Sequence, residues 1–217
     1  MTTNQTLTTA QHAESMLREH GLVAIMRGDF PVDAFLTIGE VLAENGIRVM
    51  EVTLNSTQAR EAIPALRQRF GSDLLIGAGT IRRAEQVDEA LEIGAQFIVS
   101  PNFNPEAVAR SQAAGVLHLP GVATPTEAEN AFAAGCHMLK LFPADVLGGP
   151  TYLKVIRAPL DDIDFVPTGG ITPDNAGEYR RAGAVALGLG SALVSKDWTR
   201  ENVASRAKAL VASWKSG

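Results

Sequence analysis

Eight short apolar runs rich in Val, Ile and Leu recur along the chain, and each has a length typical of a β-strand. They span residues 22–26, 49–54, 74–78, 97–100, 116–120, 138–142, 165–167 and 184–189. Amphipathic stretches with helical spacing lie between them, as at residues 31–45 and 85–93. Glycines stand where these helices should end in a left-handed cap, namely Gly46, Gly71, Gly94, Gly115, Gly135 and Gly183. The pattern predicts a repeated unit of strand, loop, helix and glycine.

Eight such units predict an α/β fold with a mainly parallel sheet, because consecutive parallel strands need helical crossovers that cover the sheet. We expect the sheet to close into a (β/α)8 TIM barrel, with an extra N-terminal helix over residues 8–20 and a last helix over 199–215. An open doubly wound sheet is the alternative, but it usually carries a G-x-G-x-x-G turn after the first strand. Here residues 27–31 read Arg-Gly-Asp-Phe-Pro. No linker interrupts the chain, so residues 1–217 are expected to form a single barrel domain.

Composition excludes several classes of protein. The chain has 46% hydrophobic residues, 19 Lys plus Arg and 24 Asp plus Glu, which is ordinary for a globular protein. The net charge of −5, without a basic run, gives no reason to expect a nucleic acid partner. No window approaches the roughly 18 apolar residues that span a bilayer, and residues 1–20 lack the apolar centre of a signal peptide. We therefore expect no membrane association and a cytoplasmic location. The single cysteine, Cys136, cannot form an intrachain disulfide and is expected to be buried.

Two charged residues stand inside predicted apolar strands, at Glu51 and Lys140. In a (β/α)8 barrel the active site lies at the carboxyl ends of the strands, so these residues are candidates for catalysis. Lys140 is the first lysine of the chain, and the other four fall in or beside predicted helices. Desolvation lowers the pKa of a lysine, and a neutral amine can attack a carbonyl to form a Schiff base. Glu51 would then carry protons. The alternative is structural: the two residues form an ion pair, Glu51 pairs with Arg27, or Lys140 reaches out from the strand edge.

Two glycine-rich loops predict an anion site. Residues 167–175 follow the seventh strand with Gly169 and Gly170, and residues 188–191 end the eighth strand similarly. In such barrels these two loops commonly bind phosphate, although glycine also serves plain turns. Arg27, with residues 77–80, is a second candidate anion point for a small carboxylate, or else a surface arginine. The four histidines (His12, His20, His118 and His137) do not cluster with other metal ligands, so no metal is expected.

Seven segments together resemble the KDPG/KHG aldolase family, and the resemblance spans residues 22–195. They are residues 51–54 (EVTL), 77–80 (GAGT), 99–101 (VSP), 119–122 (LPGV), 139–144 (LKLFPA), 167–171 (PTGGI) and 188–191 (GLGS). Members of this family cleave 2-keto-3-deoxy-6-phosphogluconate (KDPG) or 4-hydroxy-2-oxoglutarate (KHG) through a lysine Schiff base, without a metal or other cofactor. The resemblance implies a small-molecule sugar acid phosphate as partner, and a homotrimer as assembly.

The resemblance also implies roles for individual residues. Lys140 would be the Schiff-base lysine and Glu51 the general acid/base. Arg27 and Thr80 would hold the pyruvate carboxylate, while Pro101 and Phe142 would help to wall the pocket. The distal part and phosphate of the substrate would lie among Thr168, Gly169, Gly170, Gly190 and Ser191.

The sequence around the second strand leaves the substrate open. Asn55 and Ser56 stand where some gluconate-type members carry an arginine, and the same pair occurs in galactonate-specific relatives. Those relatives tend to carry proline where this chain has Thr53, and they lack the pair Pro167-Thr168. We therefore rank phosphogluconate first and its C4 epimer, phosphogalactonate, second, with hydroxyoxoglutarate as a side activity and a sulfonated analogue left open. A non-catalytic barrel that binds sugar phosphates is the remote alternative.

Overall fold

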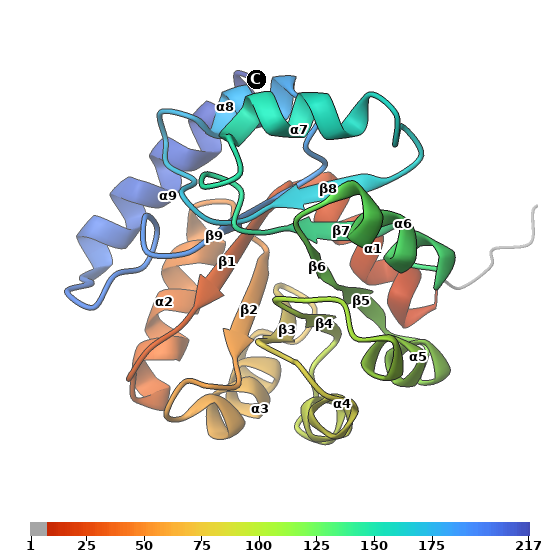
Figure 1. Cartoon of the computed structure of the whole chain (residues 1–217). Coiled ribbons are helices and arrows are strands. Elements are labelled where there is room, and N and C mark those ends of the chain that lie inside the picture. The colour runs from red at the N-terminus through yellow and green to blue at the C-terminus, as the bar shows by residue number, and fades with distance from the viewer. Residues whose placement is uncertain (1–7) are drawn as a thin grey trace, which may run out of the picture.

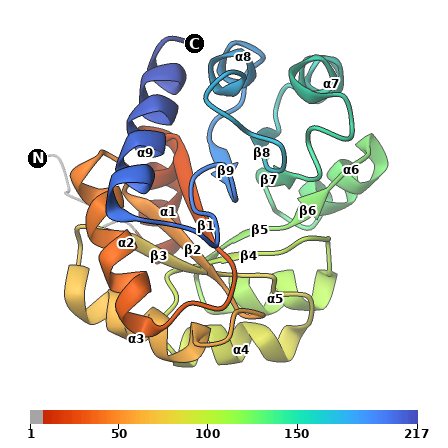
Figure 2. The ribbon, with the colours of Figure 1, turned by 90° about the vertical axis from the view of Figure 1, so that its left-hand side faces the viewer.

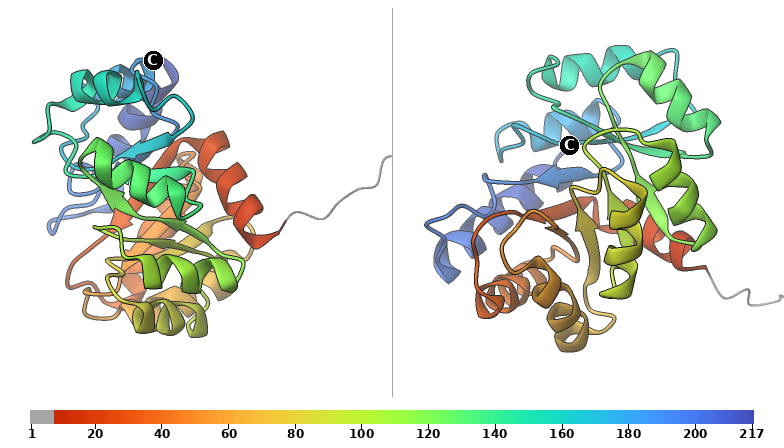
Figure 3. Two further views of the ribbon diagram at one scale, coloured as in Figure 1. Left: turned by 45° about the vertical axis from the view of Figure 1, so that its right-hand side comes forward. Right: turned by 60° about the horizontal axis from the view of Figure 1, so that its bottom comes forward.

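The computed structural model describes residues 8–217, and its strands form a curled parallel sheet with helices on the outer face (Figure 1). The strands are β1 (Leu22–Met26), β2 (Val49–Thr53), β3 (Leu75–Gly79), β4 (Phe97–Val99), β5 (Leu117–Leu119), β6 (Gly121–Val122), β7 (Met138–Leu141), β8 (Asp164–Pro167) and β9 (Leu187–Leu189). The helices are α1 (Thr9–His20), α2 (Val32–Glu44), α3 (Ala59–Phe70), α4 (Ala84–Glu92), α5 (Pro105–Ala113), α6 (Pro125–Ala133), α7 (Gly149–Arg157), α8 (Ala176–Arg181) and α9 (Arg200–Lys215). Figure 3 shows the helices around the strands from two further sides.

The strands pair in two sheets. Six strands follow the order β5-β4-β3-β2-β1-β9 and three follow β6-β7-β8, and all pairings are parallel. A bridge between Thr168 and Gly188 couples the end of β8 to β9. On the other side, the Lys140 amide donates to the carbonyl of Pro120, between β5 and β6, at 2.9 Å. The predicted parallel sheet with helical crossovers is confirmed.

Proline divides the fifth predicted strand. The expected run at residues 116–120 becomes β5 and β6, separated by Pro120. A proline has no backbone N–H and so cannot donate to the strand ladder, but its carbonyl can still accept. The strand therefore pairs with β4 before the proline and with β7 after it.

The last predicted strand begins later than its apolar run. We expected residues 184–189, but β9 covers Leu187–Leu189. The amide of Ala184 donates to the carbonyl of Tyr179 at 3.0 Å, which closes the end of α8. Ala184 therefore belongs to the helix end, whereas the amide of Val185 already donates to the carbonyl of Phe165 in β8 at 3.1 Å. All six predicted cap glycines have positive φ, but Gly71, with ψ of −113°, lies outside the left-handed helical region.

Two apolar clusters lie on the two sides of the sheet. The larger joins outward strand residues to the helices. The smaller joins inward residues such as Val23, Val49 and Phe97, and it includes Ala13 and Leu17 of α1. Thr8 caps α1 with its side chain, and the helix packs these two buried residues against the inner cluster. In the part of the chain that the structure describes, no helix combines the length and apolar character needed to cross a membrane.

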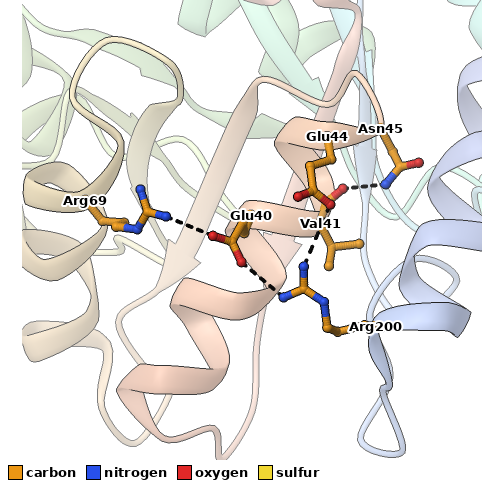
Figure 4. Close-up of polar contacts among 6 residues, drawn as sticks. All are labelled: Glu40, Val41, Glu44, Asn45, Arg69 and Arg200. Atoms are coloured by element: carbon orange, nitrogen blue, oxygen red, sulfur yellow. Dashed lines mark hydrogen bonds and ion pairs between the residues drawn. The ribbon is translucent and has the colours of Figure 1, made fainter.

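Ion pairs join neighbouring helices on the outer layer. Arg69 of α3 and Arg200 of α9 both contact the carboxylate of Glu40 in α2, at 2.8 and 3.1 Å (Figure 4). Arg200 also lies 3.8 Å from Glu44. Figure 2 shows α9 running alongside α2, so these contacts connect the C-terminal helix to the first strand–helix unit.

Candidate active site

Lys140 lies in the middle of β7 and is only 4% exposed. It pairs in register with Gly121 of β6 and Val166 of β8, and its side chain lines a cavity of about 480 Å³. Nζ lies 5.2 Å from the centroid of the Phe142 ring. Burial lowers the pKa of Lys140, Glu51 raises it, and Arg27 lowers it further. The net shift is downward, which favours the neutral amine.

Glu51 lies in β2 and is 1% exposed. Together with Lys140, Thr168 and Gly188 it lines a small cavity that adjoins the larger one through these shared residues. Burial raises the pKa of Glu51 and outweighs the lowering by Lys140 and Arg27. Among residues 8–217, Oε1 of Glu51 is buried without a hydrogen-bond partner, and no contact ion pair within 4.0 Å joins Glu51 to Lys140 or Arg27. The carboxyl lies on the inner side of the larger cavity and lines only the small one, whose volume is about 10 Å³.

Gly79 leaves the space that the Glu51 carboxyl occupies. A Cβ at position 79 would overlap Oε1 of Glu51. The sequence singled out residues 77–80 as a loop for an anion, and the structure gives Gly79 this additional steric function. Any side chain here would displace the buried carboxyl.

The larger cavity is walled by the two predicted glycine loops. Thr168, Gly169 and Gly170 lie on one side, and Gly190 and Ser191 on the other. Gly169 and Gly170 have φ values of 101° and 67°, so this turn uses a backbone conformation that other residues rarely adopt. Ile171, Thr172 and Gly188 of the predicted loops also line it, and the lining residues that were not predicted are Ile25, Ala192 and Val194.

Asn175 holds the loop between β8 and α8. Its Oδ1 accepts from the amide of Thr172 and its Nδ2 donates to the carbonyl of Gly170, both at 2.9 Å. Asp145 packs behind the same loop, where a Cβ at Gly170 would overlap its side chain. Neither residue was singled out from the sequence. Asn175 could have been found from the sequence, because it follows a double glycine and precedes a short helix, and Asn side chains commonly bond to the backbone at turns.

Arg27 follows β1 directly and lines the cavity. Its Nη2 donates to Oγ1 of Thr80 at 3.4 Å. Thr80 has φ of 61°, and among residues 8–217 it is the one residue other than glycine with positive φ. Such backbone conformations cost free energy and occur often at binding sites. The structure therefore brings Arg27 and Thr80 together, and of the two only Arg27 lines the cavity.

Phe142 and Pro101 lie in different places. Phe142 lines the cavity with Lys140. Pro101 lies in a neighbouring cleft of about 190 Å³ with Asn102 and Gly121, where its carbonyl leaves no space for a Cβ at Gly121. Pro101 thus packs behind the end of β4 instead of facing the larger cavity.

His118 has a polar environment of its own. Its Nε2 lies 2.7 Å from Oγ of Ser100 and its Nδ1 2.9 Å from Oγ of Ser111. Burial lowers the pKa of His118 to about 4, so the ring is neutral at pH 7.

Within residues 8–217, no three His, Cys, Asp or Glu side chains are grouped as metal ligands. Cys136 is buried as expected, and burial raises the pKa of its thiol to about 11.

The fold and this geometry define a class of protein. A lysine held away from water at the wall of a cavity, beside a buried carboxyl and within a parallel α/β sheet, is the arrangement of an enzyme that forms an imine with a carbonyl substrate. The model of the family "KDPG and KHG aldolase" matches residues 13–210. The chain belongs to this aldolase family, and it is a carbon–carbon lyase.

Curated relatives agree with the family match. The chain is 40% identical over 195 residues to the 2-dehydro-3-deoxy-6-phosphogalactonate aldolase of Escherichia coli K12, which covers 89% of this chain and 94% of the relative. It is 44% identical over 148 residues to the 2-dehydro-3-deoxy-phosphogluconate aldolase of Treponema pallidum, with coverage of 68% and 70%.

Solved structures share the fold. A structure described as native KDPGal has a TM-score of 0.85 at 37% identity, covering 89% of this chain and 94% of that one. KDPG aldolase from Legionella pneumophila, with pyruvate captured as a covalent carbinolamine, has a TM-score of 0.78 at 28% identity, covering 92% and 94%.

Proposed function

We propose that the chain is a class I aldolase that cleaves KDPG to pyruvate and glyceraldehyde 3-phosphate, with 4-hydroxy-2-oxoglutarate as a second substrate cleaved to pyruvate and glyoxylate. The observation that carries this proposal is the buried Lys140 amine at the cavity wall next to the buried Glu51. The covalent pyruvate carbinolamine of the Legionella relative supports the same chemistry.

The proposed reaction uses Lys140 as the covalent electron sink. Its neutral amine attacks the substrate ketone and water leaves, which forms an iminium ion. Glu51 removes the proton of the C4 hydroxyl, the C3–C4 bond breaks, and the electron pair of that bond moves through C3 to the iminium nitrogen to give an enamine. The aldehyde leaves, C3 is reprotonated, and hydrolysis of the iminium releases pyruvate and regenerates Lys140.

The two ends of the cavity hold the two ends of the substrate in this proposal. Arg27 and Thr80 hold the carboxylate, since a guanidinium can donate two hydrogen bonds to it. The phosphate lies among Thr168, Gly169, Gly170, Gly190 and Ser191, where glycines let backbone amides approach closely. Phe142 forms part of the wall, whereas Pro101 lies in the neighbouring cleft.

Phosphogalactonate, the C4 epimer, is the second candidate substrate. The Escherichia coli phosphogalactonate aldolase matches the chain over 94% of its own length, and this chain carries Asn55 after Leu54. The two substrates differ only in the configuration at C4. Comparing kcat/KM for the two epimers distinguishes the candidates directly.

We also infer a closed (β/α)8 barrel that forms a single domain, with α1 as the extra N-terminal helix; the first seven residues of the predicted domain, 1–217, lie outside the described residues. The Thr168–Gly188 bridge and the bond from the Lys140 amide to Pro120 support closure, because they connect the two sheets at both seams. A homotrimer is the assembly that the family resemblance implies, and light scattering tests it. The cytoplasmic location stays a prediction.

The deciding experiment is to trap pyruvate on the protein with borohydride and to locate the adduct by peptide mass spectrometry. We expect an adduct on Lys140 and none in the Lys140→Met variant, which should also lose turnover by roughly 10³-fold or more. Lys208→Met, on exposed α9, is the matched control and should retain the adduct. A folded protein without any adduct would instead support a non-catalytic sugar-phosphate binder.

A further inference from the structure

A second cavity of about 590 Å³ lies between helices α7 and α8, and it shares no lining residue with the central one. These helices run side by side in Figures 1 and 2. Lys154, Arg157 and Arg181 line this α7–α8 groove together with Thr151 and one acid, Glu178. Three cations against one carboxylate leave an excess of positive charge, although the whole chain carries −5.

Ion pairs join several neighbouring helices of the outer layer, but within residues 8–217 none crosses the α7–α8 groove. From α9 through α2, α3 and α4 to α5, arginines pair with carboxylates of the neighbouring helix: Arg200 and Arg69 with Glu40 (Figure 4), Arg60 with Glu89, and Arg110 with Asp88. Across residues 8–217, no carboxylate lies within 4.0 Å of the three groove cations, not even that of Glu178.

Arg157 is the most constrained of the three cations. Its guanidinium lies across the turn at Gly183, where a Cβ would overlap it. Within the described chain, its Nε is buried and has no hydrogen-bond partner. A buried donor without a partner costs free energy, so a ligand that accepts from it gains binding energy.

The helix ends alone do not account for this arrangement. Lys154, Arg157 and Arg181 lie in the last turns of α7 and α8, where cations are favoured by the helix dipole. Arg180, also in the last turn of α8, donates to the carbonyl of Trp214 at 2.8 Å. The three groove cations make no such bond among the described residues. The helix dipole therefore accounts for positive charge at these positions, while the N–H donors of the three side chains stay available to a ligand.

We propose that the α7–α8 groove is a second anion site that binds a small phosphate-bearing molecule. Arg157 and Arg181 donate to phosphate oxygens, because a guanidinium matches phosphate geometry, and Lys154 adds a point charge. Glu178 repels the ligand and limits the affinity. This proposal is independent of the aldolase assignment, since it concerns different residues and no chemical step.

Inorganic pyrophosphate is the probe, and amide NMR spectra of the isotope-labelled full chain at 150 mM salt are the measurement. We expect saturable shifts at residues 151–158 and 178–183. Arg157→Gln and Arg181→Gln should each weaken binding at the groove at least fivefold, and Glu178→Gln should strengthen it. Lys208→Gln removes the same charge from exposed α9 and should change the affinity less than twofold.

Three results would overturn the proposal. Shifts confined to residues 168–172 and 188–194 would show that pyrophosphate binds only in the central cavity. Equal weakening by Arg157→Gln and Lys208→Gln would show diffuse attraction without a site. Groove signals that respond to protein concentration but not to pyrophosphate would show that another copy of the chain covers the groove. Thermal unfolding of each variant verifies that it is folded. Because Arg181 is exposed, Arg181→Gln tests the site without disturbing the packing of Arg157.

Discussion

At the scale of the residue, Glu51 and Lys140 have opposite pKa shifts with the same main cause. Burial raises the pKa of the carboxyl and lowers that of the amine, so the neutral form of each is favoured. Each charge partly offsets the effect of burial on the other. Both shifts run in the direction that a Schiff-base reaction requires, because the amine must be neutral to attack and the carboxyl must be able to accept and return a proton.

Replacing Glu51 by Gln tests the acid/base role. We expect kcat to fall by about 10²–10⁴-fold while the pyruvate adduct on Lys140 still forms. Because the folded-state pKa of Glu51 lies above its ordinary 4.5, the folded protein loses stability as the pH rises through that raised pKa. Glu51→Gln should therefore be at least as stable as the wild type at pH 7, as measured by urea unfolding. Unchanged turnover across the pH range would contradict the role.

Gly79 offers a steric test of the same carboxyl. Gly79→Ala should displace the Glu51 side chain and lower kcat at least tenfold, because the added methyl occupies the position of Oε1. Gly46→Ala is the matched control, since its Cβ meets no atom within 4 Å. Its positive φ should cost about 1–2 kcal/mol of stability without changing kcat. An equal fall in kcat in both variants would mean that lost stability, and not displacement of the Glu51 carboxyl, causes the effect.

At the scale of the element, the sequence predicts strands better than their ends. The apolar run located β1 because a strand buried on both faces is continuously apolar. The division of the fifth strand at Pro120 and the late start of β9 depend on which backbone groups find partners across the sheet. A one-dimensional pattern does not contain that information.

The same limit applies to the candidate site. Lys140 and Glu51 stand out in the sequence because a charge within an apolar strand is unusual. Ile25 lines the cavity and could have been found by alternation, since it lies two residues before Arg27 on the same face. Asp145 could not, because its contact with Gly170 joins segments that only the folded sheet brings together.

The loop after β9 supplies a prediction at this scale. Ser191 lines the cavity between the two glycine loops, so Ser191→Asp places a negative charge where the phosphate is proposed to bind. We expect KM for the phosphorylated substrate to rise about tenfold or more, while borohydride trapping of pyruvate is unchanged. Ser191→Asn, a neutral side chain of the same size, should raise KM much less. An equal KM in the wild type and Ser191→Asp would place the phosphate elsewhere.

At the scale of the whole molecule, Glu40 connects parts of the chain that are far apart in sequence. It joins Arg69 of α3 and Arg200 of α9 to α2, and so links the C-terminal helix to the first strand–helix unit (Figure 4). The hydrogen bond from Arg200 is the main cause that lowers the pKa of Glu40. Its stabilising effect is therefore present above the ordinary value of 4.5 and is lost as the pH falls through the lowered pKa.

Glu40→Gln should lower Tm by about 1–2 °C at neutral pH and low salt, because exposed ion pairs contribute little individually. The difference from the wild type should shrink in 1 M salt, which screens exposed charges, and should vanish in acid as the carboxyl is protonated. Glu44→Gln is the control, since Glu44 has a single contact at 3.8 Å to the same Arg200, and its effect should be smaller. A loss that is equal in both variants, or independent of salt, would mean that the packing of α9 on α2, and not this charge network, holds the C-terminal helix in place.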